Sequence, residues 1–254
     1  MSGLLAAVAT TLVFCAPGYP GAPEDAQPLL DAFASVAAAS AGWPAGTLAA
    51  LYEPSEEGGL AKLAVPDAAL AFVPYPFYVR HAAALRLAPL AQADVAGVGT
   101  QQRWTLIARR GPLAAPQALA TYTILSVAGY SPQFVRGFAL AGWPLPEDTK
   151  ILATGQVLGT LRRVAAGEPV VALLDEEATR AMGSLPFAGE LQSLHSSAPL
   201  PVAVIAVVDQ RLPKARADAL RSALLTLSGS RAGTEALAGL KLRGFVPVHL
   251  PAMP

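Results

Sequence analysis

The stretch TTLVFCAPGYPG, at residues 10–21, sets the pattern that the rest of the chain follows. Its opening residues are β-branched or apolar and predict a buried strand, while the proline and glycine residues after them predict a turn. Glu24 and Asp25 come next, where acidic residues favour the start of a helix, and apolar residues then recur with helical spacing. The chain therefore begins with a strand, a turn and a helix.

The same order recurs in the second half of the chain. The stretch TYTILSVAGYSP, at residues 121–132, predicts a strand and a turn, and Ser131 followed by Pro132 is a typical helix start. Both predicted helices end at the letters AGWP, at residues 41–44 and 141–144. Because strands that alternate with helices favour parallel pairing, we expect an α/β fold with two lobes, each a mostly parallel sheet flanked by helices.

The remaining elements follow from the same periodicities. Strands are predicted at 10–15, 47–52, 68–73, 122–127, 150–153, 170–174, near 190–194, at 202–208 and at 245–248. Helices are predicted at about 24–41, 56–63, 75–87, 131–141, 157–166, 176–182, 216–227 and 234–240. The last stretch returns the chain to its starting lobe, so we expect lobe 1 to comprise residues 1–104 and 205–254, and lobe 2 residues 105–204.

Composition excludes several classes of function. Lys plus Arg equals Asp plus Glu at 18 each, so no excess charge attracts nucleic acid or a charged membrane surface. The chain is 53% hydrophobic, but 23 prolines and 22 glycines interrupt it. No run reaches the roughly 20 apolar residues that a membrane span requires. We expect a monomer with a small-molecule ligand and no nucleic-acid partner.

The N-terminus has no clear signal peptide. Leu4–Phe14 is apolar enough for the core of one, but no Lys or Arg precedes it. Cys15 follows a leucine at the position that lipid anchors use, but Phe14 is bulky where a small residue is needed. We therefore expect Cys15, the only cysteine, to be a buried strand thiol that forms no disulfide within the chain.

The order of elements, with FVPYPFYV at 72–79 and GFVPV at 244–248, resembles the phosphonate-binding family of type II periplasmic substrate-binding proteins. The resemblance covers about residues 11–250. It implies a non-enzymatic, periplasmic protein whose lobes are joined by two crossing segments, near 102–109 and 199–207. It also implies that the lobes close on a ligand, which is delivered to an ABC transporter in the inner membrane.

The resemblance points to one segment for anion binding. Members of the family hold oxyanion oxygens with a Ser/Thr-rich turn at a helix N-terminus in the second lobe, which corresponds here to residues 128–132. This chain keeps only Ser131, and Pro132 removes one of the amides that an oxyanion would use. Phosphonate or phosphate is therefore one candidate ligand among others.

The turns after the strands are the expected place for the ligand, because ligands of open parallel sheets bind beyond the carboxyl ends of the strands. These turns contain no Lys or Arg but many aromatic residues, which bury apolar area while their hydroxyls fix orientation. We expect an apolar or amphipathic ligand, lipid- or sterol-like. The predicted contacts are Tyr19, Tyr52, Tyr75, Phe77, Tyr78, Tyr130, Ser131, Gln156 and Asp175. Packing of the aromatics, helix capping by Ser131 and a favourable interaction of Asp175 with the helix dipole stay open as alternatives.

No motif indicates catalysis or a cofactor. His81, His195 and His249 lack the spacing of a zinc site, and no P-loop, HExxH or GxSxG motif occurs. The segment 97–102 fails the dinucleotide pattern, because Gln102 replaces its third glycine. We expect no enzyme activity, no metal and no cofactor. A hydrolase-like enzyme and a protein-binding module stay open, since triads assemble from distant residues.

Overall fold

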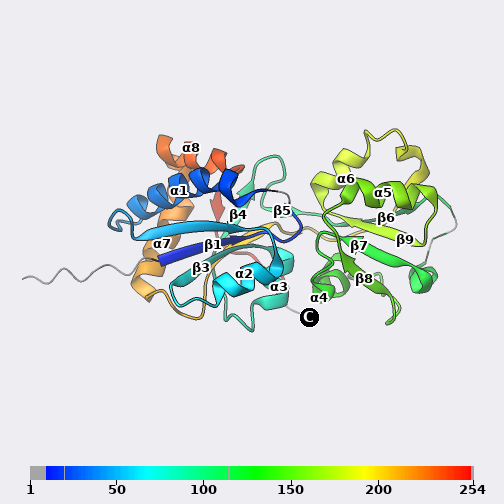
Figure 1. Ribbon diagram of the computed structural model, residues 1–254, viewed down its shortest axis with the longest axis horizontal. Helices are drawn as coiled ribbons and strands as arrows, with labels where there is room; N and C mark the ends of the chain where they lie inside the picture. Colours follow the sequence, from blue (N-terminus) through cyan, green and yellow to red (C-terminus); the bar gives the residue numbers. More distant parts are fainter. Residues whose placement is uncertain (1–9, 20, 112, 114, 253–254) are drawn as a thin grey trace, which may run out of the picture.

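The computed structural model describes residues 10–19, 21–111, 113 and 115–252. Two β-sheets organise the chain and lie side by side as two lobes (Figure 1). The first is a six-stranded sheet with the order β13-β4-β12-β3-β1-β2, and the second is a five-stranded sheet with the order β10-β6-β9-β7-β8. A two-stranded sheet of β5 and β11 lies between them.

The first lobe combines the two ends of the described chain. Its strands are β1 (Thr10–Cys15), β2 (Leu48–Glu53), β3 (Ala68–Pro74), β4 (Ala88–Val95), β12 (Ala203–Val207) and β13 (Leu242–Val246). Its helices are α1 (Pro23–Ser40), α2 (Glu56–Leu63), α3 (Tyr75–His81), α7 (Lys214–Thr226) and α8 (Arg231–Gly239), with the short turn η4 (Leu227–Gly229). β1 pairs in parallel with β2 and β3, whereas β12 is antiparallel to β3 and β4. The sheet is therefore mixed.

Strand β1 shows why this lobe has apolar cores on both faces of its sheet. Successive side chains of a strand point to opposite faces. Leu12 and Phe14 join one buried cluster with the apolar face of α1, whereas Val13 and Cys15 join another with α2 and α3. The continuous apolar run in the sequence is thus the mark of a strand covered on both sides.

The second lobe follows a similar plan. Its strands are β6 (Thr105–Arg109), β7 (Thr123–Ser126), β8 (Lys150–Ala153), β9 (Val170–Leu174) and β10 (Leu191–Ser196). Its helical segments are η1 (Pro116–Thr121), α4 (Pro132–Phe134), the π-helical turn η2 (Val135–Ala139), α5 (Val157–Ala166), α6 (Glu176–Met182) and η3 (Ala188–Glu190). β7 pairs in parallel with β8 and β9, and β6 is antiparallel to β9.

Two short crossing segments join the lobes and pair with each other. β5 (Gln101–Gln102) is antiparallel to β11 (Leu200–Pro201), with Gln102 opposite Leu200. Beside this pair the backbone N–H of Trp104 donates to Oγ of Ser197 at 3.0 Å. The buried side chain of Gln92 donates to the carbonyl of Thr100 at 2.6 Å, which ties the first crossing to β4. The crossings are therefore fastened to each other and to the first lobe.

Several predicted elements have the observed bounds, including the helices at 56–63, 157–166 and 176–182. The helix predicted over 75–87 is wrong in length, because α3 ends at His81 and is followed by a turn and then by β4, which the sequence analysis missed. The helix predicted over 131–141 is shorter and includes a π-helical turn. None of the described helices has the length and apolar character to cross a bilayer. The apolar segment 4–14, which was not interpreted as a signal peptide, begins outside the described residues.

Candidate ligand-binding site between the lobes

The loops that follow β1, β7 and β8 come into contact between the lobes. A Cβ atom added to Gly18, after β1, would lie 3.0 Å from the carbonyl oxygen of Val127, after β7. A Cβ added to Gly155, after β8, would lie 3.4 Å from the carbonyl oxygen of Gly18. The absence of a side chain at these glycines allows the three backbone segments to approach one another this closely.

A hydrogen bond between side chains joins the lobes at the same place. The hydroxyl of Tyr19 donates to Oδ2 of Asp175 at 3.2 Å. Oδ1 of Asp175 accepts from the backbone N–H of Ala178 at 2.9 Å and so caps α6. Behind this pair, the hydroxyl of Tyr52 donates to the carbonyl of Tyr19 at 3.4 Å. Asp175 therefore caps its helix and also contacts the opposite lobe.

Burial changes the titration of this pair. Burial raises the pKa of Asp175, while the hydrogen bonds from Ala178 and Tyr19 act in the opposite direction. Burial also raises the pKa of Tyr19 well above its usual value, and the neighbouring carboxylate of Asp175 adds to that increase. The phenol is thus held in its neutral form, in which it can donate to the carboxylate.

Tyr75, at the start of α3 in the first lobe, packs into the second lobe. Its ring is fully buried and lies edge-on to Phe134 and Phe138, with ring centroids 6.0 Å and 5.6 Å away. Tyr78 stacks on its other side at 6.2 Å. The Tyr75 hydroxyl is buried and has no hydrogen-bond partner among the described residues. Burial raises the pKa of Tyr75 to about 12.

Tyr130, in the turn after β7 of the second lobe, packs in the opposite direction. It lies against the first-lobe cluster that contains Val13, Cys15 and Phe77. Its hydroxyl is also buried without a partner in the described part of the chain. Burial raises the pKa of Tyr130 well above its usual value, and the nearby Cys15 and Glu56 raise it further. Each lobe therefore places a tyrosine against the other.

Three of the predicted contact residues take no part in the hydrogen bonds and ring contacts described above. Phe77 is fully buried in the first-lobe core, with its ring 4.6 Å from that of His81, so it lies in the wall behind Tyr130. Gln156 is exposed at the N-terminus of α5. Ser131 is fully buried, but it makes no side-chain cap to α4, and its Oγ has no partner within the described residues. The capping interpretation of Ser131 is therefore wrong, because its ψ of 77° lies outside the extended range of a capping residue.

Cys15 is confirmed as a buried strand thiol. Its side chain is free of any disulfide and fully buried, with Sγ 3.5 Å from the carbonyl oxygen of Ser55. Burial raises the pKa of Cys15 to about 12, and the carboxylates of Glu53 and Glu56 contribute to the increase. A thiol that stays protonated in an apolar core is a poor nucleophile.

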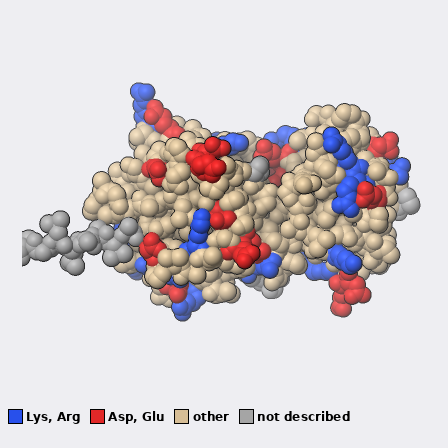
Figure 2. Space-filling model, in the orientation of Figure 1, with Lys and Arg blue, Asp and Glu red and all other residues tan. Residues whose placement is uncertain are grey.

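Acidic residues begin two helices that lie near the lobe boundary. Glu56 and Glu57 begin α2, and Glu176 and Glu177 begin α6 beside Asp175. Figure 2 shows Asp and Glu side chains next to Lys and Arg side chains in this part of the first lobe. The basic neighbours in α3 and α2 are already paired, Arg80 with Glu56 at 3.0 Å and Lys62 with Glu53 at 3.2 Å. No cluster of three or more potential metal ligands occurs among the described residues.

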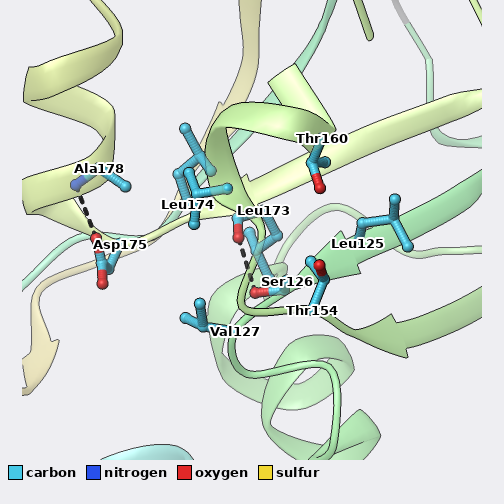
Figure 3. Close-up of a pocket in the computed structure, with 10 residues that line it drawn as sticks. Leu125, Ser126, Val127, Thr154, Thr160, Leu173, Leu174, Asp175 and Ala178 are labelled. Carbon is cyan, nitrogen blue, oxygen red and sulfur yellow. Dashed lines mark hydrogen bonds between the residues drawn. The ribbon is translucent and has the colours of Figure 1, made fainter. Parts of the chain in front are cut away.

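A small cavity lies beside Asp175, at the carboxyl ends of β7 and β9 (Figure 3). Its volume is about 10 Å³, the space of roughly one water molecule. The lining residues are Leu125, Ser126, Val127, Thr154, Val157, Thr160, Leu173, Leu174, Asp175 and Ala178. Within it, Oγ of Ser126 donates to the carbonyl of Leu173 at 2.7 Å. Ser126 was not among the predicted contact residues, although it lies one residue before the end of the strand predicted at 122–127.

The chain is similar to a known protein family and to several solved structures. Residues 70–252 match the model of a family described as "ABC transporter, phosphonate, periplasmic substrate-binding protein". No curated protein matches the sequence. Among solved structures, a protein of Xanthomonas citri bound to chloride ion is 18% identical with a TM-score of 0.69, and the match covers 94% of this chain and 92% of that chain.

Two further structures extend the likeness. A binding protein component of an ABC phosphonate transporter from Pseudomonas aeruginosa is 14% identical with a TM-score of 0.63, over 93% of this chain and 81% of that chain. A protein of Prochlorococcus marinus in complex with methylphosphonate is 10% identical with a TM-score of 0.59, over 94% of this chain and 93% of that chain. These likenesses span both lobes and confirm the predicted two-lobed fold.

Proposed function

Because this chain belongs to the phosphonate-binding family of ABC-transporter periplasmic substrate-binding proteins, we propose that it captures a small, uncharged amphipathic ligand between its lobes. Members of this family are the solute-binding components of ABC transporters, and such components are typically not enzymes. The coarse role is therefore to bind a solute and deliver it to a membrane transporter. We infer the chemical class of the ligand from the residues at the boundary between the lobes.

The buried carboxylate of Asp175 is the observation that carries the proposal. It lies at the boundary between the lobes and accepts a hydrogen bond from Tyr19. A phosphonate bound there would meet a negative charge, with Glu176 and Glu177 following directly. Like charges in a desolvated site disfavour each other, whereas a ligand hydroxyl can donate to a carboxylate at no such cost.

The tyrosines supply the apolar part of the proposed site. Aromatic rings bury large apolar areas, and their hydroxyls can hydrogen-bond to a ligand. The rings of Tyr75 and Tyr130 both lie between the lobes, and both have buried hydroxyls without partners among the described residues. We assign contact roles to Tyr19, Tyr52, Tyr75, Tyr78, Tyr130, Ser131, Gln156 and Asp175, with Phe77 supporting Tyr130 from behind. Lipid- and sterol-like molecules fit this description.

A phosphonate-type oxyanion is the second candidate, and Ser131 is the observation that favours it. Its buried hydroxyl has no partner in the described part of the chain, and it precedes α4 in the segment that corresponds to the anion turn of the family. The relative from Prochlorococcus marinus was solved with methylphosphonate. Pro132 opposes this candidate, since it lacks an N–H at the first position of the helix.

Asp175→Asn distinguishes the two candidates. Asparagine keeps an acceptor for Tyr19 but removes the charge. A hydrogen bond to a charged group contributes about 1.5–3 kcal/mol, so an uncharged ligand that donates to Asp175 should bind about ten- to a hundredfold more weakly to the variant. Binding of methylphosphonate should instead strengthen, because the repulsion is removed.

The measurement is calorimetric titration with methylphosphonate, inorganic phosphate, a soluble sterol and a monoacylglycerol, the last two of which are uncharged. Glu177→Gln is the matched control, because Glu177 lies at the same helix start but is exposed. The proposal fails if methylphosphonate or phosphate alone binds the natural protein.

Three further properties belong to the same proposal. We propose that lobe 1 comprises residues 1–104 and 205–254 and lobe 2 residues 105–204. The second sheet begins with Thr105, at the first boundary, whereas β12 of the first sheet begins at Ala203, two residues before the second boundary. We propose that the protein acts in the periplasm, as the family description implies. We also propose that it acts as a monomer. Size-exclusion chromatography with light scattering tests the last point, and a dimer would contradict it.

A further inference from the structure

We propose that the two lobes latch onto each other through their own side chains, so that the closed form must open before a ligand can enter. This inference rests on the proposed function in one respect, namely that the latch occupies the place assigned to the ligand. Three kinds of contact between the lobes carry it: aromatic packing, a side-chain hydrogen bond and the close approach of backbone segments.

The aromatic contacts are reciprocal. Tyr130 extends from the second lobe into a buried cluster whose members, such as Val13, Leu63 and Phe77, come from strands and helices packed around the first sheet. Tyr75 extends from the first lobe and lies edge-on to Phe134 and Phe138 of the second. Each ring thus fills space in the opposite lobe, which is the space that an apolar ligand would need.

The polar and backbone contacts lie in the same boundary. The hydroxyl of Tyr19 bonds to Asp175 at 3.2 Å. Beside it, Gly18 approaches Val127 so closely that a Cβ would lie 3.0 Å from the carbonyl oxygen, and Gly155 approaches Gly18 from another loop. Gly18 also has a φ of +85°, which glycine adopts more readily than other residues. The loop after β1 is therefore held between two loops of the second lobe.

The latch is reversible because closure leaves polar groups unsatisfied. The hydroxyls of Tyr75 and Tyr130 are both buried without partners among the described residues. A buried hydroxyl without a partner opposes the state that buries it, whereas water satisfies it when the lobes separate. Burial of the rings favours closure and burial of their hydroxyls opposes it. These opposing contributions keep the open form accessible.

The consequence for binding is that opening precedes capture. When only a fraction of the molecules is open, the apparent dissociation constant rises by the inverse of that fraction. A change that weakens the latch therefore strengthens apparent binding, provided that it spares the residues that contact the ligand. Gly155 is suitable for such a change, since it lies at the boundary and no contact role is assigned to it.

The test measures the distance between the lobes without any ligand. Spin labels are attached through Ser35→Cys on α1 and Arg162→Cys on α5, both exposed positions in different lobes. Cys15 is fully buried and stays unlabelled. Pulsed electron resonance then gives the distance distribution. Gly155→Phe serves as a wedge between the loops, and Tyr19→Phe removes the bond to Asp175.

Two controls separate the latch from general effects of substitution. Gly189→Phe adds the same side chain in the second lobe, where a Cβ meets nothing within 4 Å. Gly18→Ala is compared with Gly42→Ala, since both glycines have positive φ but a Cβ at Gly42 meets nothing within 4 Å. A shared effect of these two alanines reports backbone strain, and an effect of Gly18→Ala alone reports contact with the second lobe.

The latch predicts one main short distance in the natural protein. Gly155→Phe should shift it to a longer distance, Tyr19→Phe should increase the long-distance population several-fold, and Gly189→Phe should leave the distribution unchanged. Binding of the dye anilinonaphthalene sulfonate, which reports exposed apolar surface, should rise several-fold with opening. A mainly long distance in the natural protein, or no response to Gly155→Phe, overturns the latch. These outcomes involve no natural ligand, so they are independent of the titrations that test the proposed function.

Discussion

Replacement of Tyr75 by phenylalanine should stabilise the folded protein. The ring of Tyr75 is fully buried, and its contacts with Phe134 and Phe138, at centroid distances of 6.0 Å and 5.6 Å, do not involve the hydroxyl. That hydroxyl is buried without a partner among the described residues. A buried, unsatisfied polar group costs about 1–3 kcal/mol, so Tyr75→Phe should raise the free energy of unfolding by about 1 kcal/mol or more.

Differential scanning calorimetry measures this effect. A change of about 1 kcal/mol corresponds to a rise in Tm of about 2–4 °C for a chain of this size. Tyr78→Phe is the matched control, because Tyr78 stacks on Tyr75 but is only partly buried, and it should change Tm by less than about 1 °C. A fall in Tm for Tyr75→Phe would refute the reasoning, since it would mean that the hydroxyl has a partner that stabilises it.

Three other outcomes follow from the same structure. Cys15 is buried and its pKa is raised to about 12, so iodoacetamide at pH 8 should modify it only after denaturation, as mass spectrometry can show. The pKa of Tyr75 is also raised to about 12, so the unfolded chain loses this proton first and the free energy of unfolding should fall as pH rises from about 10 to 12. Tyr75→Phe should reduce that fall in urea titrations. Gln92→Ala should lower Tm by several degrees, because the buried amide bonds to Thr100 and His249, and an unchanged Tm would contradict this.

Local chemistry explains why many elements could be predicted. Ser55 and Asp175 each accept a hydrogen bond from a backbone N–H three residues ahead, so the helix starts were visible in the sequence. Gly167, with a φ of +84°, ends α5 in the same local way. These helix ends depend on interactions between residues that are close in the sequence, so they could be predicted without knowledge of contacts to distant parts of the chain.

Strand β4 could not be predicted for the opposite reason. Its sequence, APLAQADV, contains residues with weak preference for strands. It pairs with β12 on one side and β13 on the other, and both partners lie more than 100 residues later in the chain. The pairing that makes it a strand is therefore a tertiary effect. The turn that precedes it contains Arg86 at a φ of +46°, which also breaks the predicted continuation of α3.

The candidate site could be located only in part. Tyr75 and Tyr130 could be predicted as contact residues because each lies in the turn after a strand, where ligands of open parallel sheets bind. Nothing in their neighbours along the chain shows that each ring enters the opposite lobe, because that depends on how the lobes are placed relative to each other. The same holds for the bond between Tyr19 and Asp175, which joins residues 156 positions apart.

The paired crossing segments limit how the lobes can rotate. β5 and β11 bond to each other, and the carbonyl of Ser197 accepts from the guanidinium of Arg103 at 2.6 Å. Two crossing segments without bonds between them could twist separately and would allow the lobes to rotate about several axes. We expect crossing segments that are bonded to each other to bend together, which favours rotation of the lobes about one shared axis. A small displacement at that axis becomes a large one at the far rim of each lobe, where a docking membrane protein can sense it.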